Sequence, residues 1–237
     1  MRRWKSNASR WPVRREVRQP SLALAGMSGV GKTFHSLRLA ALGYRRFSCD
    51  AWIARRLALR ADEPDETIGA LAAWMGFPDD ERYAERAAWY RRLEAEALED
   101  VLAHPGGGDG DDSPLVIDTT GSVVYLPDRL LTRLRAAVCV VHLETPPDQR
   151  ARMLEAFLAR PTPLIWGSAF DRHEGESRSD ALHRCYARLL DTREKAYARL
   201  AHIGVGFEEH RRPGFDLPGR VRAAWKRTID ERPGARR

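Results

Sequence analysis

The stretch Gly26-Met27-Ser28-Gly29-Val30-Gly31-Lys32-Thr33 decides how the rest of this sequence is interpreted. Its spacing fits G-x-x-x-x-G-K-[ST], the loop that binds the phosphates of nucleoside triphosphates. Its glycines let backbone N–H groups turn inward without a Cβ in the way, and a following helix adds its partly positive N-terminus. Lys32 would reach the β- and γ-phosphates, and the Thr33 hydroxyl would ligate Mg²⁺. We therefore predict that residues 26–33 bind ATP together with Mg²⁺.

The residues on either side of this loop fit a strand before it and a helix after it. Residues 21–25 form a short apolar run that suits a buried strand. Residues 33–42 carry apolar side chains at helical spacing, and Gly43 then ends the pattern. The alternative is a glycine-rich turn between a strand and a helix that binds no phosphate.

Composition describes a globular domain. The chain has 237 residues, of which 31% are charged and 43% hydrophobic. No apolar run approaches the roughly 20 residues needed to cross a bilayer, so we expect no membrane partner. The three cysteines, Cys49, Cys139 and Cys185, are widely spaced. They fit a protein of a reducing compartment, and we expect neither a disulfide framework nor a zinc site.

The net charge of +7 is concentrated at the two ends. Residues 1–19 carry about +6 and residues 226–237 about +3, so the remainder is near −2. We therefore expect no nucleic-acid partner. The N-terminal stretch lacks the apolar region of a secretory signal. We expect disordered basic tails over 1–19 and 229–237 and a cytoplasmic protein, with organelle targeting as the alternative because the first tail is rich in arginine and nearly free of acids.

Strand and helix patterns alternate along the chain. This alternation predicts an α/β fold with three α/β/α layers around a parallel five-stranded sheet. Ligands of such sheets bind beyond the carboxyl ends of the strands, where Asp50 and Asp118 both fall. The expected strands are 21–25, 44–50, 115–118, 137–143 and 203–207, and the expected helices are 33–42, 51–60, 67–75, 81–102, 127–135, 146–159, 181–201 and one beginning near Pro218.

Residues 20–228 resemble the shikimate kinases, in the nucleoside-monophosphate-kinase-like branch of P-loop proteins. That family follows its second strand with Asp-x-Asp-x-x-Ile, and residues 48–53 keep the second aspartate as Asp50 but have Ser48 for the first. The resemblance makes Asp50 the residue that contacts and deprotonates the acceptor hydroxyl. It also implies a P-loop kinase fold with a small helical acceptor lobe, here with a loop insert over 57–112, and a lid over 150–180.

Three further runs match family motifs. Residues 90–94 (Tyr-Arg-Arg-Leu-Glu) resemble Phe-Arg-x-hydrophobic-Glu, and residues 193–201 fit Arg-x-x-x-Tyr-x-x-x-Ala. The resemblance gives Arg91 and Arg193 the role of binding the acceptor carboxylate. Residues 160–164 (Arg-Pro-Thr-Pro-Leu) resemble the Arg-Pro-Leu of the lid, which makes Arg160 the transition-state arginine. The Arg211-Arg212 pair resembles the adenine-side loop only with shifted spacing.

The family's Gly-Gly-Gly turn is replaced here by Thr119-Thr120-Gly121. By resemblance, Thr120 and Gly121 would border the acceptor. Asp118 stands before this turn, where related kinases place an aspartate that organises magnesium. The acceptor therefore differs from shikimate, or the site binds shikimate in a different way.

Each of these residues also has a structural interpretation. Asp50 could cap the helix that follows it, Asp118 could be a turn or capping residue, and Arg91 could form solvated pairs on a charged helix. The lid arginine could be another of the neighbouring arginines, Arg150, Arg152 or Arg172.

The sequence favours an ATP-dependent phosphotransferase that acts on a hydroxyl of a small carboxylated acceptor, shikimate or a related compound. One alternative is another P-loop small-molecule kinase, for a gluconate-like sugar acid or a nucleoside. The other is a nucleotide-binding module without catalysis. We expect a monomer in each case.

Overall fold

The computed structural model describes residues 19–59, 63–104 and 113–230. Nearly all of the basic tail predicted over 1–19 lies outside these ranges, as does the glycine- and aspartate-rich loop at 105–112. Of the tail predicted over 229–237, residues 231–237 lie outside them, and residues 229–230 are helical instead of disordered. In the described parts of the chain, no helix is both long and apolar enough to cross a bilayer.

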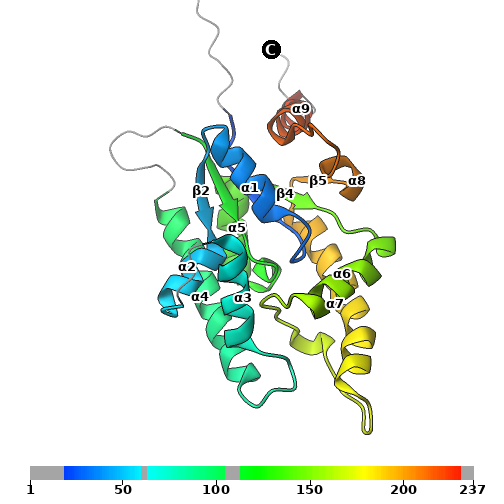
Figure 1. Ribbon diagram of the computed structural model, residues 1–237. Coiled ribbons are helices and arrows are strands. Elements are labelled where there is room, and N and C mark those ends of the chain that lie inside the picture. Colours follow the sequence, from blue (N-terminus) through cyan, green and yellow to red (C-terminus); the bar gives the residue numbers. More distant parts are fainter. Residues whose placement is uncertain (1–18, 60–62, 105–112, 231–237) are drawn as a thin grey trace, which may run out of the picture.

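A five-stranded sheet forms the centre of the molecule (Figure 1). The strands follow the order β2-β3-β1-β4-β5, and every neighbouring pair is parallel. β1 is therefore central, and the loop that leaves it opens in the middle of the carboxyl edge. The predicted five-stranded parallel sheet is confirmed. Its strands are β1 (Leu22–Ala25), β2 (Arg45–Ser48), β3 (Leu115–Asp118), β4 (Cys139–Leu143) and β5 (Ile203–Val205).

Helices cover both faces of the sheet, because the strand side chains alternate between two apolar clusters. Leu22 and Leu24 pack in one cluster with α1 (Lys32–Ala41) and α9 (Leu217–Asp230). Ala23 and Ala25 pack in the other cluster, against the helices that form the larger part of the protein. These are α2 (Cys49–Arg56), α3 (Pro64–Met75), α4 (Tyr83–Ala103), α5 (Asp128–Ala137), α6 (Arg150–Ala159) and α7 (Arg178–Leu200).

Local chemistry sets the helix boundaries where they differ from prediction. The strand predicted over 44–50 stops at Ser48, because the Ser48 hydroxyl accepts a bond from Ala51 N (3.2 Å) and caps α2. α3 begins three residues earlier than predicted, with Pro64 in its first turn. Four short elements were not predicted: α8 (Phe207–His210) and 3₁₀ turns at Val123–Tyr125, Pro147–Gln149 and Gly167–Ala169.

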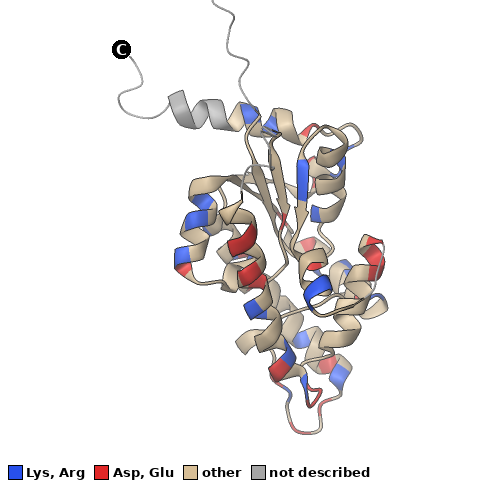
Figure 2. Cartoon of the chain, turned by 90° about the vertical axis from the view of Figure 1, so that its left-hand side faces the viewer, with Lys and Arg blue, Asp and Glu red and all other residues tan. Residues whose placement is uncertain are grey.

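Two helical lobes extend below the carboxyl edge of the sheet, α2–α4 on one side and α6–α7 on the other (Figure 1). Ion pairs join them at the far end, where Arg178 lies 2.9 Å from both Asp79 and Asp80, and Arg172 lies 3.1 Å from Asp79. Basic and acidic residues accordingly lie side by side at this end (Figure 2).

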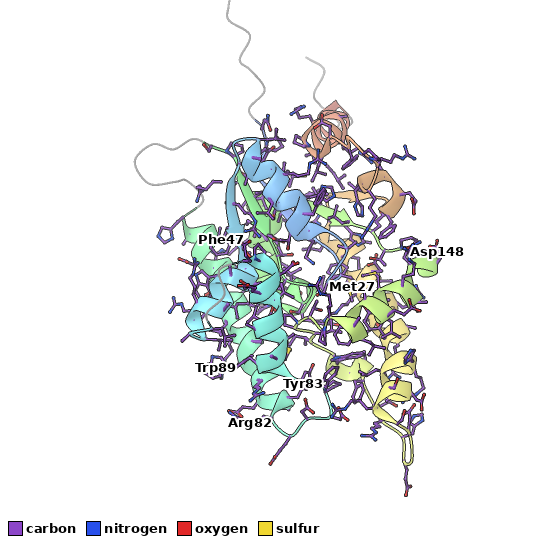
Figure 3. All side chains as sticks on the ribbon, in the orientation of Figure 1. Met27, Phe47, Arg82, Tyr83, Trp89 and Asp148 are labelled. Atoms are coloured by element: carbon purple, nitrogen blue, oxygen red, sulfur yellow. The ribbon has the colours of Figure 1, made fainter. Side chains whose placement is uncertain are left out.

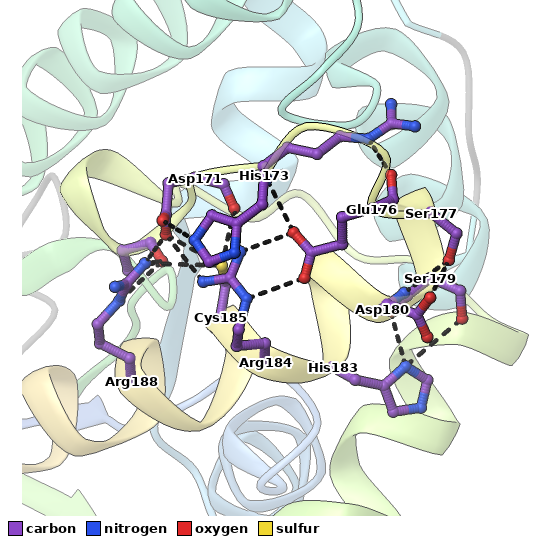
Figure 4. Close-up of polar contacts among 12 residues, drawn as sticks. Asp171, His173, Glu176, Ser177, Ser179, Asp180, His183, Arg184, Cys185 and Arg188 are labelled. Carbon is purple, nitrogen blue, oxygen red and sulfur yellow. Dashed lines mark hydrogen bonds and ion pairs between the residues drawn. The ribbon is translucent and has the colours of Figure 1, made fainter.

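The hairpin that enters α7 is held by a second ionic cluster. Arg184 pairs with Glu176 (2.8 Å) and Asp171 (3.2 Å), and Arg188 also pairs with Asp171 (Figure 4). Exposed pairs contribute little singly, but a network of this kind fixes a geometry. The second half of the lid predicted over 150–180 is therefore anchored to α7 and to the α3–α4 turn.

Tyr83, at the start of α4, connects the two helical lobes by hydrogen bonds in the protein interior (Figure 3). Its hydroxyl donates to the Leu164 carbonyl (2.8 Å) and accepts from the Trp166 amide (2.9 Å). Leu164 and Trp166 are themselves buried. The hydroxyl thus satisfies two backbone groups that have no access to water.

Tyr83→Phe should lower the free energy of unfolding by about 1–3 kcal/mol, because it leaves a buried amide and a buried carbonyl without their partner. Urea unfolding measures the change. Tyr44→Phe is the matched control, since the Tyr44 hydroxyl is also buried but has no hydrogen-bond partner. Equal effects of the two substitutions would contradict the bridging role of Tyr83.

Candidate functional site

The loop between β1 and α1 adopts a backbone that only glycine accepts easily. Gly26, Gly29 and Gly31 have φ values of 145°, 81° and 113°. A Cβ on Gly26 would lie 2.7 Å from the Leu143 carbonyl oxygen, so the loop packs directly against the end of β4. Gly31 precedes α1 as its N-cap residue, so no side chain caps the helix, and its first turn holds no acidic residue. Its first N–H groups therefore suit an anion.

Lys32 lies inside this loop. Its side chain is buried, and Nζ donates to the carbonyls of Gly26 (2.9 Å) and Met27 (3.0 Å). Met27 itself lies near the middle of the molecule (Figure 3). Burial lowers the pKa of Lys32, and the charges of Asp118 and Asp50 oppose that shift. Phosphate oxygens would be stronger partners for this ammonium than neutral carbonyls.

A large cavity opens beside the loop. Its volume is about 1240 Å³, and its lining includes Lys32, Thr33, Asp50 and Gly121. Ligand pockets usually measure about 300–1,000 Å³, so this cavity has room for a nucleotide and a second small molecule. The structure thus brings the predicted phosphate loop and Asp50 to one space.

Asp50 lies in the first turn of α2 and faces this cavity. Ser48 caps the helix, so the alternative that Asp50 is the cap is wrong. The Tyr90 hydroxyl donates to Asp50 Oδ1 at 2.7 Å. Burial raises the pKa of Asp50, and the bond from Tyr90 acts against that increase. One carboxylate oxygen is thus held by the protein in a fixed orientation.

The two predicted metal ligands have different surroundings. Thr33 lines the cavity, whereas Asp118 is buried outside its lining. Asp118 Oδ2 accepts from Ser36 Oγ (3.0 Å) and pairs with Arg46 (2.7 Å). Within the part of the chain that the structure describes, no group of three or more His, Cys, Asp or Glu side chains could hold a metal. Thr33 could serve as the protein ligand of a Mg²⁺ bound mainly by phosphates and water. The role of Asp118 at the metal stays a prediction.

Arg91 and Arg193 come together, but around Tyr125 instead of the cavity. Arg193 is completely buried; it donates to the Ile165 carbonyl, and its guanidinium lies 5.1 Å from the centre of the Tyr125 ring. Arg91 donates to the Tyr125 carbonyl at 2.6 Å. Neither arginine is part of the cavity lining. Their predicted role in binding an acceptor carboxylate remains a prediction.

The residues of the turn Thr119-Thr120-Gly121 have different surroundings. Gly121 lines the cavity, and a Cβ there would lie 2.9 Å from Ser28 Oγ. Thr120 is buried and donates to the carboxyl of Glu94, which also lies 3.0 Å from the Ser122 hydroxyl. Burial raises the pKa of Glu94 to about 8. Thr120 therefore binds the protein interior and leaves Gly121 at the cavity surface.

Two of the four candidate lid arginines reach the cavity. Arg160 and Arg152 line it. Arg150 instead pairs with Asp191, and Arg172 with Asp79. Arg211, the residue directly after α8, also lines the cavity, and its guanidinium lies 4.2 Å from the centre of the Phe207 ring.

Sequence reasoning did not assign roles to Tyr90 or Glu94. Both belong to the motif at residues 90–94 on α4 and lie one helical turn apart, so they share a face. One contacts Asp50, and the other contacts the turn at 119–122. The sequence held one indication of these roles: two polar side chains, four residues apart, on a helix face that is otherwise apolar and buried.

Comparison with solved structures finds the same fold in shikimate kinases. The enzyme from Acinetobacter baumannii, in complex with shikimate, superposes with a TM-score of 0.53 and 19% identity over 88% of this chain and 90% of the other. The shikimate kinase from Bacteroides thetaiotaomicron gives 0.51 and 19% over 89% and 97%. No family model and no curated protein matches the sequence. The P-loop kinase fold is therefore shown.

Tyr90→Phe should move the acidic limb of the pH–rate profile to higher pH. The Tyr90 hydroxyl favours the ionised form of Asp50, so its loss raises the Asp50 pKa further, and activity that needs the carboxylate disappears sooner as pH falls. A hydrogen bond to a charged group of about 1.5–3 kcal/mol corresponds to roughly one to two pH units. The rate of ADP release across pH measures it.

Tyr186→Phe is the control for this substitution. Tyr186 lines the same cavity, and its pKa is raised to about 12 by burial, with the charge of Arg193 acting against that increase. An acidic limb that moves equally in both variants would show that the Tyr90–Asp50 bond does not set it.

Proposed function

We propose that this protein transfers the γ-phosphoryl group of ATP to a hydroxyl of a small molecule bound in the 1240 Å³ cavity. The observation that carries the proposal is that Lys32, Thr33 and Asp50 line this one cavity. Phosphoryl transfer depends mainly on positioning and charge neutralisation, and a phosphate loop beside a held carboxylate supplies both.

In this proposal the nucleotide phosphates lie on residues 26–33. Lys32 releases the carbonyls of Gly26 and Met27 and binds phosphate oxygens, while the N–H groups at the start of α1 bind the rest of the anion. Bound Mg²⁺ would neutralise part of the phosphate charge, with the Thr33 hydroxyl as its protein ligand. Arg152 and Arg160, which line the cavity, would neutralise charge on the transferred group.

Asp50 acts on the acceptor. Its carboxylate accepts the proton of the acceptor hydroxyl as the hydroxyl oxygen forms a bond to the γ-phosphorus. The bond between the γ-phosphorus and the β–γ bridging oxygen breaks, and ADP leaves with that electron pair. Tyr90 holds the other side of the carboxylate during this step.

The acceptor is the finer part of the proposal. Shikimate is the compound to which the sequence resemblance points, and a gluconate-like sugar acid or a nucleoside is the alternative within the same reaction class. Nucleotide binding without catalysis is the rival from another class. It predicts ATP binding with no ADP release for any acceptor.

A coupled assay of ADP release tests the proposed reaction directly. MgATP is supplied alone and then with each member of a panel of hydroxyl compounds that includes shikimate, gluconate, uncharged polyols and nucleosides. The proposal expects at least one compound to increase ADP release well above the background hydrolysis. Tight ATP binding with no increase for any of them would favour the non-catalytic module.

Lys32→Ala should reduce kcat/KM by at least about a hundredfold, the range seen when one preorganised charge-stabilising group is removed. The loss follows because the buried ammonium is the one lysine of the cavity lining among the described residues. Lys195→Ala is the matched control, because Lys195 is exposed on α7. An active Lys32→Ala enzyme would contradict the assignment of the phosphate site.

A further inference from the structure

We propose that a second pocket of this protein binds a small organic cation, an aliphatic diamine, at a site separate from the phosphate loop. The pocket has a volume of about 490 Å³, which lies within the usual range for ligand sites. It is formed by the end of β4 and the residues that follow it, by one face of α7 and by the residues that follow β5.

Four carboxylates line this pocket, and two of them have a positive partner. Glu209 pairs with Arg220 at 2.8 Å. Glu194 Oε2 lies 3.1 Å from His142 Nε2, which is an ion pair when the imidazole is protonated. These contacts offset the charge of two carboxylates, so the need for a ligand rests on the other two.

The side chains of Glu144 and Glu208 have no hydrogen bond or ion pair with any described residue. No Lys or Arg among the described residues belongs to the lining of the pocket. Arg211, whose guanidinium lies over the Phe207 ring, lines the larger cavity instead. The pocket therefore keeps negative charge after its ion pairs are counted, and that charge attracts a cation.

Buried polar atoms without partners lie in the same pocket. Thr145 and His142 are 4% and 3% exposed, and both line it. Thr145 Oγ1, His142 Nε2 and Glu194 Oε1 have no hydrogen-bond partner. Buried polar atoms are normally satisfied, so their gathering at one pocket points to a ligand independently of its net charge. A protonated amine has three N–H donors and no acceptor, and the Thr145 and Glu194 oxygens are acceptors.

The polar groups of this pocket lie at two depths, which favours an elongated ligand. Thr145 is buried with Glu194 beside it, whereas Glu144 and Glu208 are exposed at the mouth. Within the described residues, no group of three or more His, Cys, Asp or Glu side chains could hold a metal ion. A diamine places one ammonium at the buried end and the other at the mouth. Its alkyl chain then meets the apolar part of the lining, which consists of Pro146, Ala198 and Phe207.

The pocket adjoins the proposed nucleotide site without being part of it. Among the described residues, Phe207 and Glu208 alone line both this pocket and the 1240 Å³ cavity. Glu144 directly follows Leu143, whose carbonyl packs against Gly26 of the phosphate loop. A diamine in this pocket therefore lies next to the phosphate loop and leaves the loop free for its own ligand.

Titration calorimetry of the full-length protein with 1,4-diaminobutane at constant ionic strength tests the proposal. The wild type should bind the diamine saturably with a Kd below about 1 mM, both without nucleotide and with saturating MgADP. It should not bind 1,4-butanediol, the uncharged analogue. Absence of saturable diamine binding would overturn the proposal, and loss of that binding in MgADP would overturn a separate site. The affinity for MgADP itself bears on the proposed function and not on this pocket.

Glu144→Gln/Glu208→Gln should weaken diamine binding about tenfold, because it removes the two carboxylates that have no partner. Glu81→Gln/Glu155→Gln is the matched control, since it removes two exposed carboxylates that lie outside the lining. Equal weakening in both double variants would show a general attraction to an acidic surface and contradict a defined site.

Thr145→Val distinguishes a ligand contact from a structural role. It replaces an unpartnered buried hydroxyl by a methyl group, so the urea midpoint of the free protein should stay the same or rise. Diamine binding should weaken about fivefold, because one acceptor is lost. Unchanged diamine affinity in a folded Thr145→Val protein would overturn the contact with Thr145. If this variant does not fold, the two double variants still decide whether the pocket is the site.

Discussion

The ammonium of Lys32, buried inside the loop after β1, is the interaction on which the account of this protein depends. It is held by two neutral carbonyls, those of Gly26 and Met27. A buried cation is costly unless it is paired, and the uncapped start of α1 adds further positive potential at the same point. The parallel sheet places this point at the middle of its carboxyl edge, because β1 is the central strand. An anion at this loop would satisfy both groups at once.

α4 organises the other half of the site. Tyr90 reaches Asp50, and Glu94 one turn later reaches Thr120 and Ser122. A single buried helix face thus orients the carboxylate that would receive a proton and the turn that exposes Gly121. The two threonines of that turn do not project freely into the cavity: Thr119 donates to the Leu24 carbonyl (2.7 Å) and Thr120 to Glu94. The threonine hydroxyls therefore bind protein groups behind the site and do not form part of its surface.

Much of the fold follows from local patterns. The alternation of apolar strand patterns with helix patterns predicts the parallel sheet, and the motif at residues 26–33 predicts the loop at its centre. The sequence does not reveal contacts made between distant segments. The hydroxyl of Ser48 caps α2, so the carboxylate of Asp50 is not used as the helix cap. Asp118 meets Arg46 from the neighbouring strand β2, a pairing that depends on sheet order. Arg91 and Arg193 carry the expected spacing, but their contacts depend on Tyr125, which belongs to a short 3₁₀ turn without a sequence pattern of its own.

The most direct test of the central claim is a crystal structure of the protein with Mg²⁺ and a non-hydrolysable ATP analogue. The account predicts that the phosphates lie against the backbone amides of residues 26–33, that Lys32 Nζ has moved from the carbonyls of Gly26 and Met27 to phosphate oxygens, and that the Thr33 hydroxyl ligates the metal. A nucleotide bound elsewhere, with Lys32 still on the two carbonyls that it contacts here, would contradict it.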